Sequence, residues 1–181
     1  MSDEPEETQL AAAKLAQTIV FTSQGTPFMF AGEEIFRDKK GIHNSYNKPD
    51  SINAIDWENK TKYRDQFDYY KGLTSLRRQH PAFRMTSAED IAQNLVFDEV
   101  DSEQTPNLIS YSLKNHANGD KWEEIKVVLN GASYSQKIEL PKANWKIISY
   151  DGKINPDEGL GSTEGGEMTL PPYSALILAK E

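Results

Sequence analysis

The sequence predicts a mainly β fold, in which a C-terminal antiparallel β-sandwich follows two helices and one strand. Residues 84–181 contain six to eight short segments in which apolar and polar residues alternate, with turns rather than helices between them. Such a series is typical of an antiparallel sandwich or barrel. Residues 1–83 instead contain two helical periodicities around one continuous apolar run. We therefore expect two parts, residues 1–83 and residues 84–181.

The first helix is predicted over residues 5–22. Pro5 and the acidic residues beside it suit a first helical turn, where the helix dipole favours negative charge. Apolar residues then recur over a broad face of the helix until Gly25. A face this wide predicts that the helix packs against more than one neighbour.

The second helix is predicted over residues 63–79, because aromatic residues and leucines recur there at spacings of four and three. Arg77, Arg78 and His80 crowd its C-terminal end, where the helix dipole favours cations, and Pro81 ends it. From their order in the chain we expect the two helices to flank one strand.

That strand is predicted within Phe28 to Ala31, a continuous apolar run without alternation. Such a run is typical of a strand buried on both faces, as in a parallel sheet. The chain holds no second strand of this kind to pair with it. Residues 36–62 follow as a polar loop rich in asparagine.

The remaining strands are predicted from alternation around Ile109, Ile125 and Ile138, and from the final segment SALILAK. The glycine-rich stretch DEGLGSTEGGE, residues 157–167, lacks the lysine and the following helix of a phosphate-binding loop. We expect it to be a hairpin loop between strands.

Three aromatic residues decide whether the sandwich offers a face for sugar rings. Alternation predicts that Trp145 shares a face with Ile147, and that Tyr150 shares the opposite face with Ile148, so both aromatics are expected in the core. Trp122 falls on the face opposite the apolar face of its segment, so alternation does not decide whether its ring is buried.

The composition excludes several classes of function. The 181 residues carry a net charge of -8, which disfavours non-specific binding to nucleic acid or to anionic membranes. The chain holds no run of eighteen apolar residues, so no membrane span is expected, and the first residues lack the apolar core of a signal peptide. The compartment stays open. With no cysteine and three widely spaced histidines, we expect neither a metal site nor a cofactor.

Carboxylates and amides are concentrated in and beside the polar loop. The four acidic residues there, Glu33, Glu34, Asp50 and Asp56, are of the type used in glycoside hydrolysis, but isolated loop acids are more often solvated or capping groups. Amide side chains and aromatic rings suit sugar hydroxyls and ring faces, whereas asparagines in a loop also make turns. This candidate sugar-contact set is Asn44, Tyr46, Asn47, Asn53 and Trp57.

The residues around this loop resemble a known family. The stretch SQGTPFMFAGEEIFR resembles the last barrel strand of type I pullulanases, with Gly32 and Glu34 in the family's Gly-x-Glu pattern. HNSYNKPDSINAIDW resembles the loop that follows it, and YYKGLTSLRRQHPAF resembles the final barrel helix and its exit. Residues 84–181 resemble, in layout, the all-β domain that closes such enzymes.

Type I pullulanases are debranching enzymes of the α-amylase superfamily, built on a (β/α)₈ barrel with the active site at the C-terminal ends of its strands. The resemblance implies hydrolysis of α-1,6 linkages in pullulan, starch or glycogen. The family's catalytic acids lie on earlier strands, and no segment here matches them, so we assign no catalytic residue. Glu34, Asn44 and Tyr46 are the candidates for substrate contact at the active-site rim. Asp56 and Trp57 are weaker candidates that brace the loop.

Several expectations follow from this resemblance. The chain alone is predicted to lack hydrolase activity, and its partners are an α-glucan, bound through the parent enzyme, and an upstream barrel domain. The loop of residues 41–57 is expected to be mobile or rearranged without that barrel. The alternative is a non-catalytic carbohydrate-binding or structural β-sandwich module.

Overall fold

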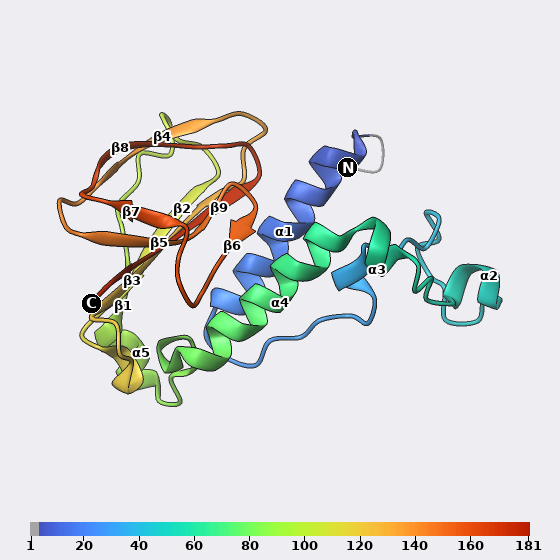
Figure 1. The fold of residues 1–181 in the computed structure, drawn as a ribbon, viewed down its shortest axis with the longest axis horizontal. Coiled ribbons are helices and arrows are strands. Elements are labelled where there is room, and N and C mark those ends of the chain that lie inside the picture. The colour runs from blue at the N-terminus through green and yellow to red at the C-terminus, as the bar shows by residue number, and fades with distance from the viewer. Residues whose placement is uncertain (1–3) are drawn as a thin grey trace.

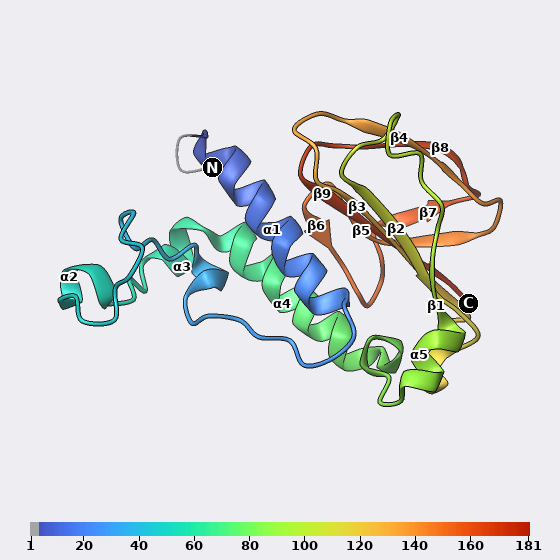
Figure 2. The ribbon, with the colours of Figure 1, turned by 180° about the vertical axis from the view of Figure 1, so that it is seen from behind.

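The computed structural model describes residues 4–181, and it separates three regions along the longest axis of the molecule. Two long helices cross the middle, with a β-rich region on one side and irregular loops on the other (Figure 1). The view from behind shows the same arrangement (Figure 2). The helices are therefore the link between the loops and the sheets.

The two long helices are those predicted from the sequence. Helix α1 spans Glu6–Thr22 and helix α4 spans Arg64–Gln79, each within one residue of its predicted bounds. They pack together through a small cluster built on Phe21 and Leu73. A buried hydrogen bond of 2.7 Å between the hydroxyls of Thr18 and Tyr69 also joins the two helices.

The strand predicted over residues 28–31 is absent. These residues run as irregular chain and end in a short 3-10 helix, η1 (Glu33–Ile35). The side chain of Phe28 is 81% exposed, and that of Phe30 is half exposed. A strand requires a neighbour for its backbone N–H and C=O groups, and none lies beside this run among residues 4–181. Only two short helices, α2 (Asp50–Asn53) and α3 (Asn59–Lys62), interrupt the loop that follows.

Two short helical segments, which the sequence pattern did not predict, lead into the sheets. They are η2 (Pro81–Arg84) and α5 (Ala88–Asn94). Ser87 caps α5, because its hydroxyl accepts a hydrogen bond of 3.0 Å from the amide of Asp90. The cap and the two acidic residues of the first turn are the signal that identifies this helix in the sequence.

The rest of the chain forms two antiparallel sheets, as predicted. The larger has seven strands in the order β1-β2-β3-β9-β5-β6, with β7 also paired to β5, and the smaller pairs β4 with β8. One further 3-10 turn, η3 (Ala117–Gly119), lies between β2 and β3. The strands are β1 (Leu95–Phe97), β2 (Leu108–Leu113), β3 (Glu124–Asn130), β4 (Gln136–Leu140), β5 (Trp145–Tyr150), β6 (Lys153–Ile154), β7 (Gly161–Thr163), β8 (Gly166–Leu170) and β9 (Ser174–Lys180).

The larger sheet is covered on both faces. Alternate residues of β3 and β9, such as Val127 and Ile177, join a cluster with Leu15 and Leu76 of the long helices. The residues between them, such as Leu176, join a second cluster with the β4–β8 pair. The sheet thus lies between a helical layer and a two-stranded layer, so the apolar core continues from one predicted part into the other.

Two strand-level predictions need correction. Tyr150 packs in the same cluster as Trp145 and Ile147, whereas Ile148 faces the helices, because the register shifts by a bulge between Ile147 and Ser149. The stretch 157–167 is not a simple loop, since β7 and the start of β8 lie within it. A Cβ at residue 165 would lie 2.3 Å from the backbone oxygen of Pro141, which explains the glycine there.

Candidate functional site

The polar loop starts at a tight turn that only glycine fits. Gly32 has a φ of 97°, and a Cβ there would lie 2.7 Å from Cδ of Arg37. The backbone amide of Gly32 donates to the carboxylate of Glu34 at 3.0 Å, and the amide of Arg37 donates to the carbonyl of Gly32 at 2.9 Å. The Gly-x-Glu pattern therefore builds a turn that folds the chain back on itself.

Asn53 holds the loop together. Its side-chain amide nitrogen donates to the carbonyls of Ser45 and Lys48, both at 2.7 Å, and its side-chain oxygen accepts from Nζ of Lys39 at 2.8 Å. Arg37 donates to the backbone carbonyl of Asn53 as well. Asn53 thus uses its amide for bracing, which is the turn-forming role that asparagines in loops also have.

The other predicted contact residues lie on the surface of this loop. Tyr46 is 84% exposed and Trp57 is 66% exposed, and Asn44 is exposed as well. Asp56 accepts a hydrogen bond of 3.0 Å from the amide of Glu58, so it starts the turn before α3. Glu34 is half-buried at η1.

The structure does not draw these five residues into one polar cluster. Within residues 4–181, no hydrogen bond joins any two of them. Helix α2 and its flanking loops extend from the helices on the side away from the sheets (Figures 1 and 2). The loop therefore presents aromatic rings and amides outward, as a surface suited to stacking rather than as an enclosed site.

The acidic residue Glu33, beside the loop, is paired within the fold. The carboxylate of Glu33 accepts a hydrogen bond of 2.6 Å from Nε2 of Gln17, and burial raises its pKa above the ordinary range. No group of three metal-binding side chains occurs in the described part of the chain. Glu33 thus serves a contact within the fold, between the start of the loop and α1.

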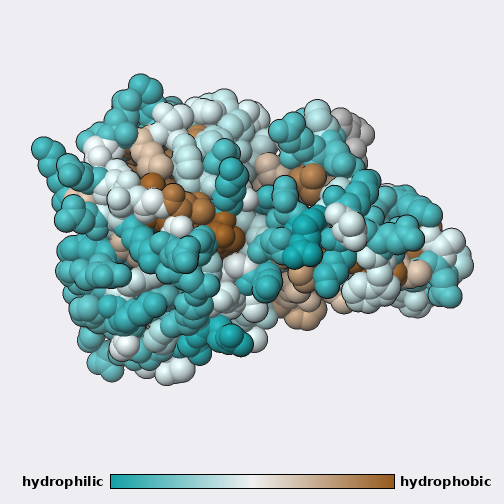
Figure 3. Space-filling view, in the orientation of Figure 1, coloured by the Kyte–Doolittle hydropathy of each residue, from teal (hydrophilic) through white to brown (hydrophobic). Residues whose placement is uncertain are grey.

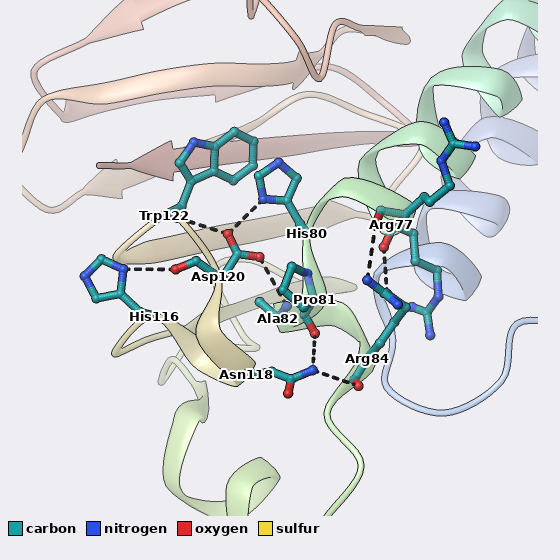
Figure 4. A network of polar contacts seen from close by, with 10 residues as sticks. Arg77, His80, Pro81, Ala82, Arg84, His116, Asn118, Asp120 and Trp122 are labelled. Atoms are coloured by element: carbon teal, nitrogen blue, oxygen red, sulfur yellow. Dashed lines mark hydrogen bonds and ion pairs between the residues drawn. The ribbon is translucent and has the colours of Figure 1, made fainter.

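A second polar feature, which the sequence pattern did not reveal, joins the helices to the sheets (Figure 4). The Nδ1 of His80 lies 2.9 Å from a carboxylate oxygen of Asp120, and both side chains are fully buried. The same carboxylate accepts from the backbone amides of Trp122 at 3.0 Å and of Ala82 at 3.2 Å. The ring of His80 stacks on Trp122 with centroids 3.5 Å apart.

The charge of Asp120 is stabilised in this buried position. Burial by itself opposes ionisation, but the hydrogen bonds from His80, Trp122 and Ala82 outweigh it and hold the pKa of Asp120 below its ordinary range. Trp122 is only 2% exposed, which settles the position that alternation left open. His80 was expected to interact with the dipole at the end of its own helix. Its ring instead contacts Asp120, in the segment just before β3.

Two arginines beside His80 bind backbone carbonyls at the ends of the long helices. Arg77 donates to the carbonyls of Phe21 at 2.8 Å and of Ser23 at 2.7 Å. It therefore caps the end of α1, in addition to the predicted interaction with the dipole of its own helix, α4. Arg84 donates to the carbonyl of Arg77 at 3.0 Å and closes the end of α4. The two helices and the first turn after them are thus fixed as one unit (Figure 4).

Comparisons with known proteins agree with this fold. Residues 91–153 match the family model described as pullulanase, all-beta domain. A pullulanase of Bacillus subtilis is 38% identical over 128 residues, which cover 71% of this chain and 17% of the relative. The structure of a pullulanase from Bacillus acidopullulyticus is 42% identical, with a TM-score of 0.90, over 99% of this chain and 21% of that one.

A third match is a pullulanase from Anoxybacillus in complex with maltotriose, 29% identical with a TM-score of 0.85 over 99% of this chain and 24% of that one. Fold and sequence together make the chain similar to one part of known debranching enzymes. Within that class, the predicted resemblance to part of a pullulanase is confirmed. The chain spans about a fifth of the length of these relatives.

Proposed function

We propose that the chain is the C-terminal part of a pullulanase-like glycoside hydrolase that acts on α-1,6 linkages of pullulan, starch or glycogen. The observation that carries this proposal is the likeness over 99% of the chain to a pullulanase structure of which it spans only 21%. Alone, the chain is inactive, because no segment matches the family's catalytic carboxylates. Its role is to contribute the end of the barrel and the domain that closes it.

The exposed apolar run supports the expected barrel partner. Phe28 and Phe30 project into solvent directly before the tight turn at Gly32. The neighbouring strands of an upstream barrel would pair with this run and cover its side chains. The run would then become the strand that the sequence pattern predicts.

Under this proposal the loop surface forms part of the rim of the active site. Asn44 and Tyr46, exposed beyond the barrel mouth, contact the glucan, and Glu34 lies at the base of the loop. Asp56 and Trp57 brace the segment that leads into α3. The complex of a similar pullulanase with maltotriose supports an α-glucan as the ligand of the parent enzyme.

The alternative, a carbohydrate-binding module built on the sandwich, has less support. Trp122 and Trp145 are buried to 2% and 1% exposure, so neither ring offers a face to a sugar. A structural role for the sheets fits better, because residues of α1, α4 and the segments that follow them pack in one apolar cluster with the larger sheet. Affinity electrophoresis in pullulan separates the two roles. Slower migration of the sandwich in the presence of pullulan would favour the binding module.

A chimera tests the proposal most sharply. Residues 8–181 would replace the corresponding stretch of the Bacillus acidopullulyticus pullulanase, and a reducing-sugar assay on pullulan would report activity. We expect turnover from the chimera and none from the 181-residue chain. In the chimera, Tyr46→Ala should raise KM several-fold, since an aromatic contact contributes about 0.5–1.5 kcal/mol.

The matched control for this variant is Tyr134→Ala, which removes a half-exposed tyrosine of the sandwich and should leave KM unchanged. A correctly folded chimera without activity would contradict the proposed function. Turnover of pullulan by the 181-residue chain would contradict the claim that it is inactive alone.

A further inference from the structure

Two cations link the exposed apolar run of residues 28–31 to the polar loop. Arg37 donates from one guanidinium nitrogen to the carbonyl of Ala31 at 3.0 Å, and from another to the backbone carbonyl of Asn53. Nζ of Lys39 donates to the side-chain oxygen of Asn53 at 2.8 Å. The end of the run and the far end of the loop are therefore joined directly. We call Arg37 and Lys39 the basic clamp.

Both side chains of the basic clamp also lie over one aromatic ring of the run. The guanidinium carbon of Arg37 is 5.3 Å, and Nζ of Lys39 is 5.7 Å, from the centroid of the Phe30 ring. A cation within about 6 Å of a ring centroid is attracted by the negative face of the ring. Apolar patches are visible beside the helices within an otherwise hydrophilic face (Figure 3). The clamp thus contacts the run through a ring and a carbonyl, and the loop through Asn53.

Asn53 extends this link to Tyr46. Its side-chain nitrogen donates to the carbonyls of Ser45 and Lys48, the two residues that flank Tyr46 and Asn47. The amide of Lys48 also donates to the carbonyl of Ser45 at 3.0 Å, so these four residues form a turn with Tyr46 at its second position. Because Asn53 holds both ends of the turn, the exposed ring of Tyr46 projects from a braced backbone.

The basic clamp fits a positioning role better than a ligand site. Arg37 and Lys39 already donate to oxygens of Ala31 and Asn53, and a neutral glucan offers no charge for two cations. A loop that is held in one conformation loses less conformational freedom when a ligand binds, so the ligand binds more tightly. The contacts of the clamp therefore favour binding at Tyr46 although the clamp itself does not touch the ligand.

We propose that Arg37 and Lys39 are positioning residues, which act through Asn53 to fix the turn at Tyr46 relative to the run of residues 28–31. The consequence for glucan binding rests on the proposed function, in which the run is a barrel strand and Tyr46 contacts the glucan. The clamp lies away from the reacting atoms and braces a binding surface. Its loss should therefore weaken binding of the glucan and leave the chemical step unchanged.

The first test uses the isotope-labelled 181-residue chain and needs no barrel. The steady-state ¹H–¹⁵N NOE of the backbone amide of Tyr46 reports the order of the turn. Lys39→Met and Arg37→Met should each lower this NOE, because methionine cannot donate to Asn53. Lys40→Met, at an exposed neighbouring lysine, should leave it unchanged. Asn53→Asp should also lower it, since a carboxylate still accepts from Lys39 but cannot donate to the turn.

The second test uses the chimera with the Bacillus acidopullulyticus pullulanase. Lys39→Met should raise KM for pullulan about two- to fivefold with kcat unchanged, as expected for lost binding that is equal in ground and transition states. A loss of stability alone would instead lower the active fraction and hence kcat. Lys39→Arg, which keeps a cationic donor, should restore KM. In an Asn53→Ala background, Lys39→Met should have no further effect, because Lys39 acts through Asn53.

Three results would overturn the proposal. They are an unchanged NOE of Tyr46 in folded Lys39→Met, an unchanged KM in the chimera, and an effect of Lys39→Met on KM that persists in the Asn53→Ala background. The thermal midpoint checks the folding of each variant, and Lys39→Met decides if Arg37→Met does not fold. A chimera that is inactive with its native residues would instead contradict the proposed function, and the NOE of Tyr46 would still decide whether the clamp orders the turn.

Discussion

Two apolar runs in this chain look alike in sequence and differ entirely in structure. Phe28 to Ala31 are exposed irregular chain, whereas Ala175 to Leu178 form the buried centre of β9. Strand β9 has β3 on one side and β5 on the other, with helices over one face and the β4–β8 pair over the other. An apolar run therefore predicts a place for a doubly buried strand, and the neighbours decide whether the strand forms.

The largest effect is expected where the helices are fixed to the region of β9. Asp120→Asn removes the charge that accepts from His80, Ala82 and Trp122 in a fully buried position. Breaking a buried pair by changing one partner costs about 3–5 kcal/mol. Urea unfolding followed by Trp fluorescence would measure the loss.

The control for this variant is Asp68→Asn, whose side chain is exposed and pairs with Arg64 one helical turn away. An exposed pair of this spacing contributes little to stability, so the loss should be far smaller than for Asp120→Asn. Equal losses of unfolding free energy for the two variants would mean that the contacts of Asp120 do not hold the helices on the sheet.

A similar but somewhat smaller effect is expected within β9 itself. Leu176 is fully buried between the sheets, and Leu176→Ala should cost about 2–5 kcal/mol through lost contacts and a cavity. Calorimetry would report it as a lower unfolding temperature. A loss below 1 kcal/mol would show that the second layer packs loosely on this strand.

The carboxyls of Asp120 and Glu33 should make the free energy of unfolding depend on pH with opposite signs. The pKa of Asp120 is lowered on folding, so its contribution is present above the unfolded value of about 3.9 and is lost as pH falls through the folded value. The pKa of Glu33 is raised by burial, so its effect reduces stability as pH rises from about 4.3 to the folded value.

Unfolding curves from pH 2 to 7 would separate these two contributions. Asp120→Asn should flatten the loss of stability in acid. Glu33→Gln should gain stability over the unmodified chain as pH rises, since glutamine stays neutral and can still accept from Gln17. A steeper loss of stability in acid for Asp120→Asn would contradict the lowered pKa of Asp120. A loss of stability with rising pH for Glu33→Gln would contradict the raised pKa of Glu33.

The smallest effect is expected in the exposed run. Phe28→Ala should change the free energy of unfolding of this chain by less than about 0.5 kcal/mol, as for other surface positions. Leu176→Ala, at a fully buried position of β9, should cost several times more. A loss above 2 kcal/mol would mean that Phe28 is packed in solution.

The sequence predicted much of this fold because local patterns determine helices and alternating strands. Both long helices and the main strands follow directly from periodicity. The face of Tyr150 was predicted wrongly, since a bulge changes the register without a sequence signal strong enough to place it. The pairing of His80 with Asp120 joins residues forty positions apart, and no single-sequence spacing predicts such a contact.

The candidate site was predictable only in part. The sequence marked the loop, and the exposure of Tyr46 and Trp57 agrees with a contact surface, but it did not show that Asn53 braces the loop. The strand over residues 28–31 was predicted from a pattern whose partners are not among residues 4–181. The cavity lined by Lys14, Asp151 and Tyr173 was not predicted, because its walls come from four separate segments.

Native-state hydrogen exchange compares the two apolar runs most directly. The amides of Leu176 to Leu178 should exchange only through global unfolding, because they lie in the centre of the larger sheet. The amides of Phe28 to Phe30 should exchange at rates near those of an unstructured peptide. Protection of Phe28 to Phe30 within tenfold of that of β9 would contradict the account, since the run would then already have its neighbours.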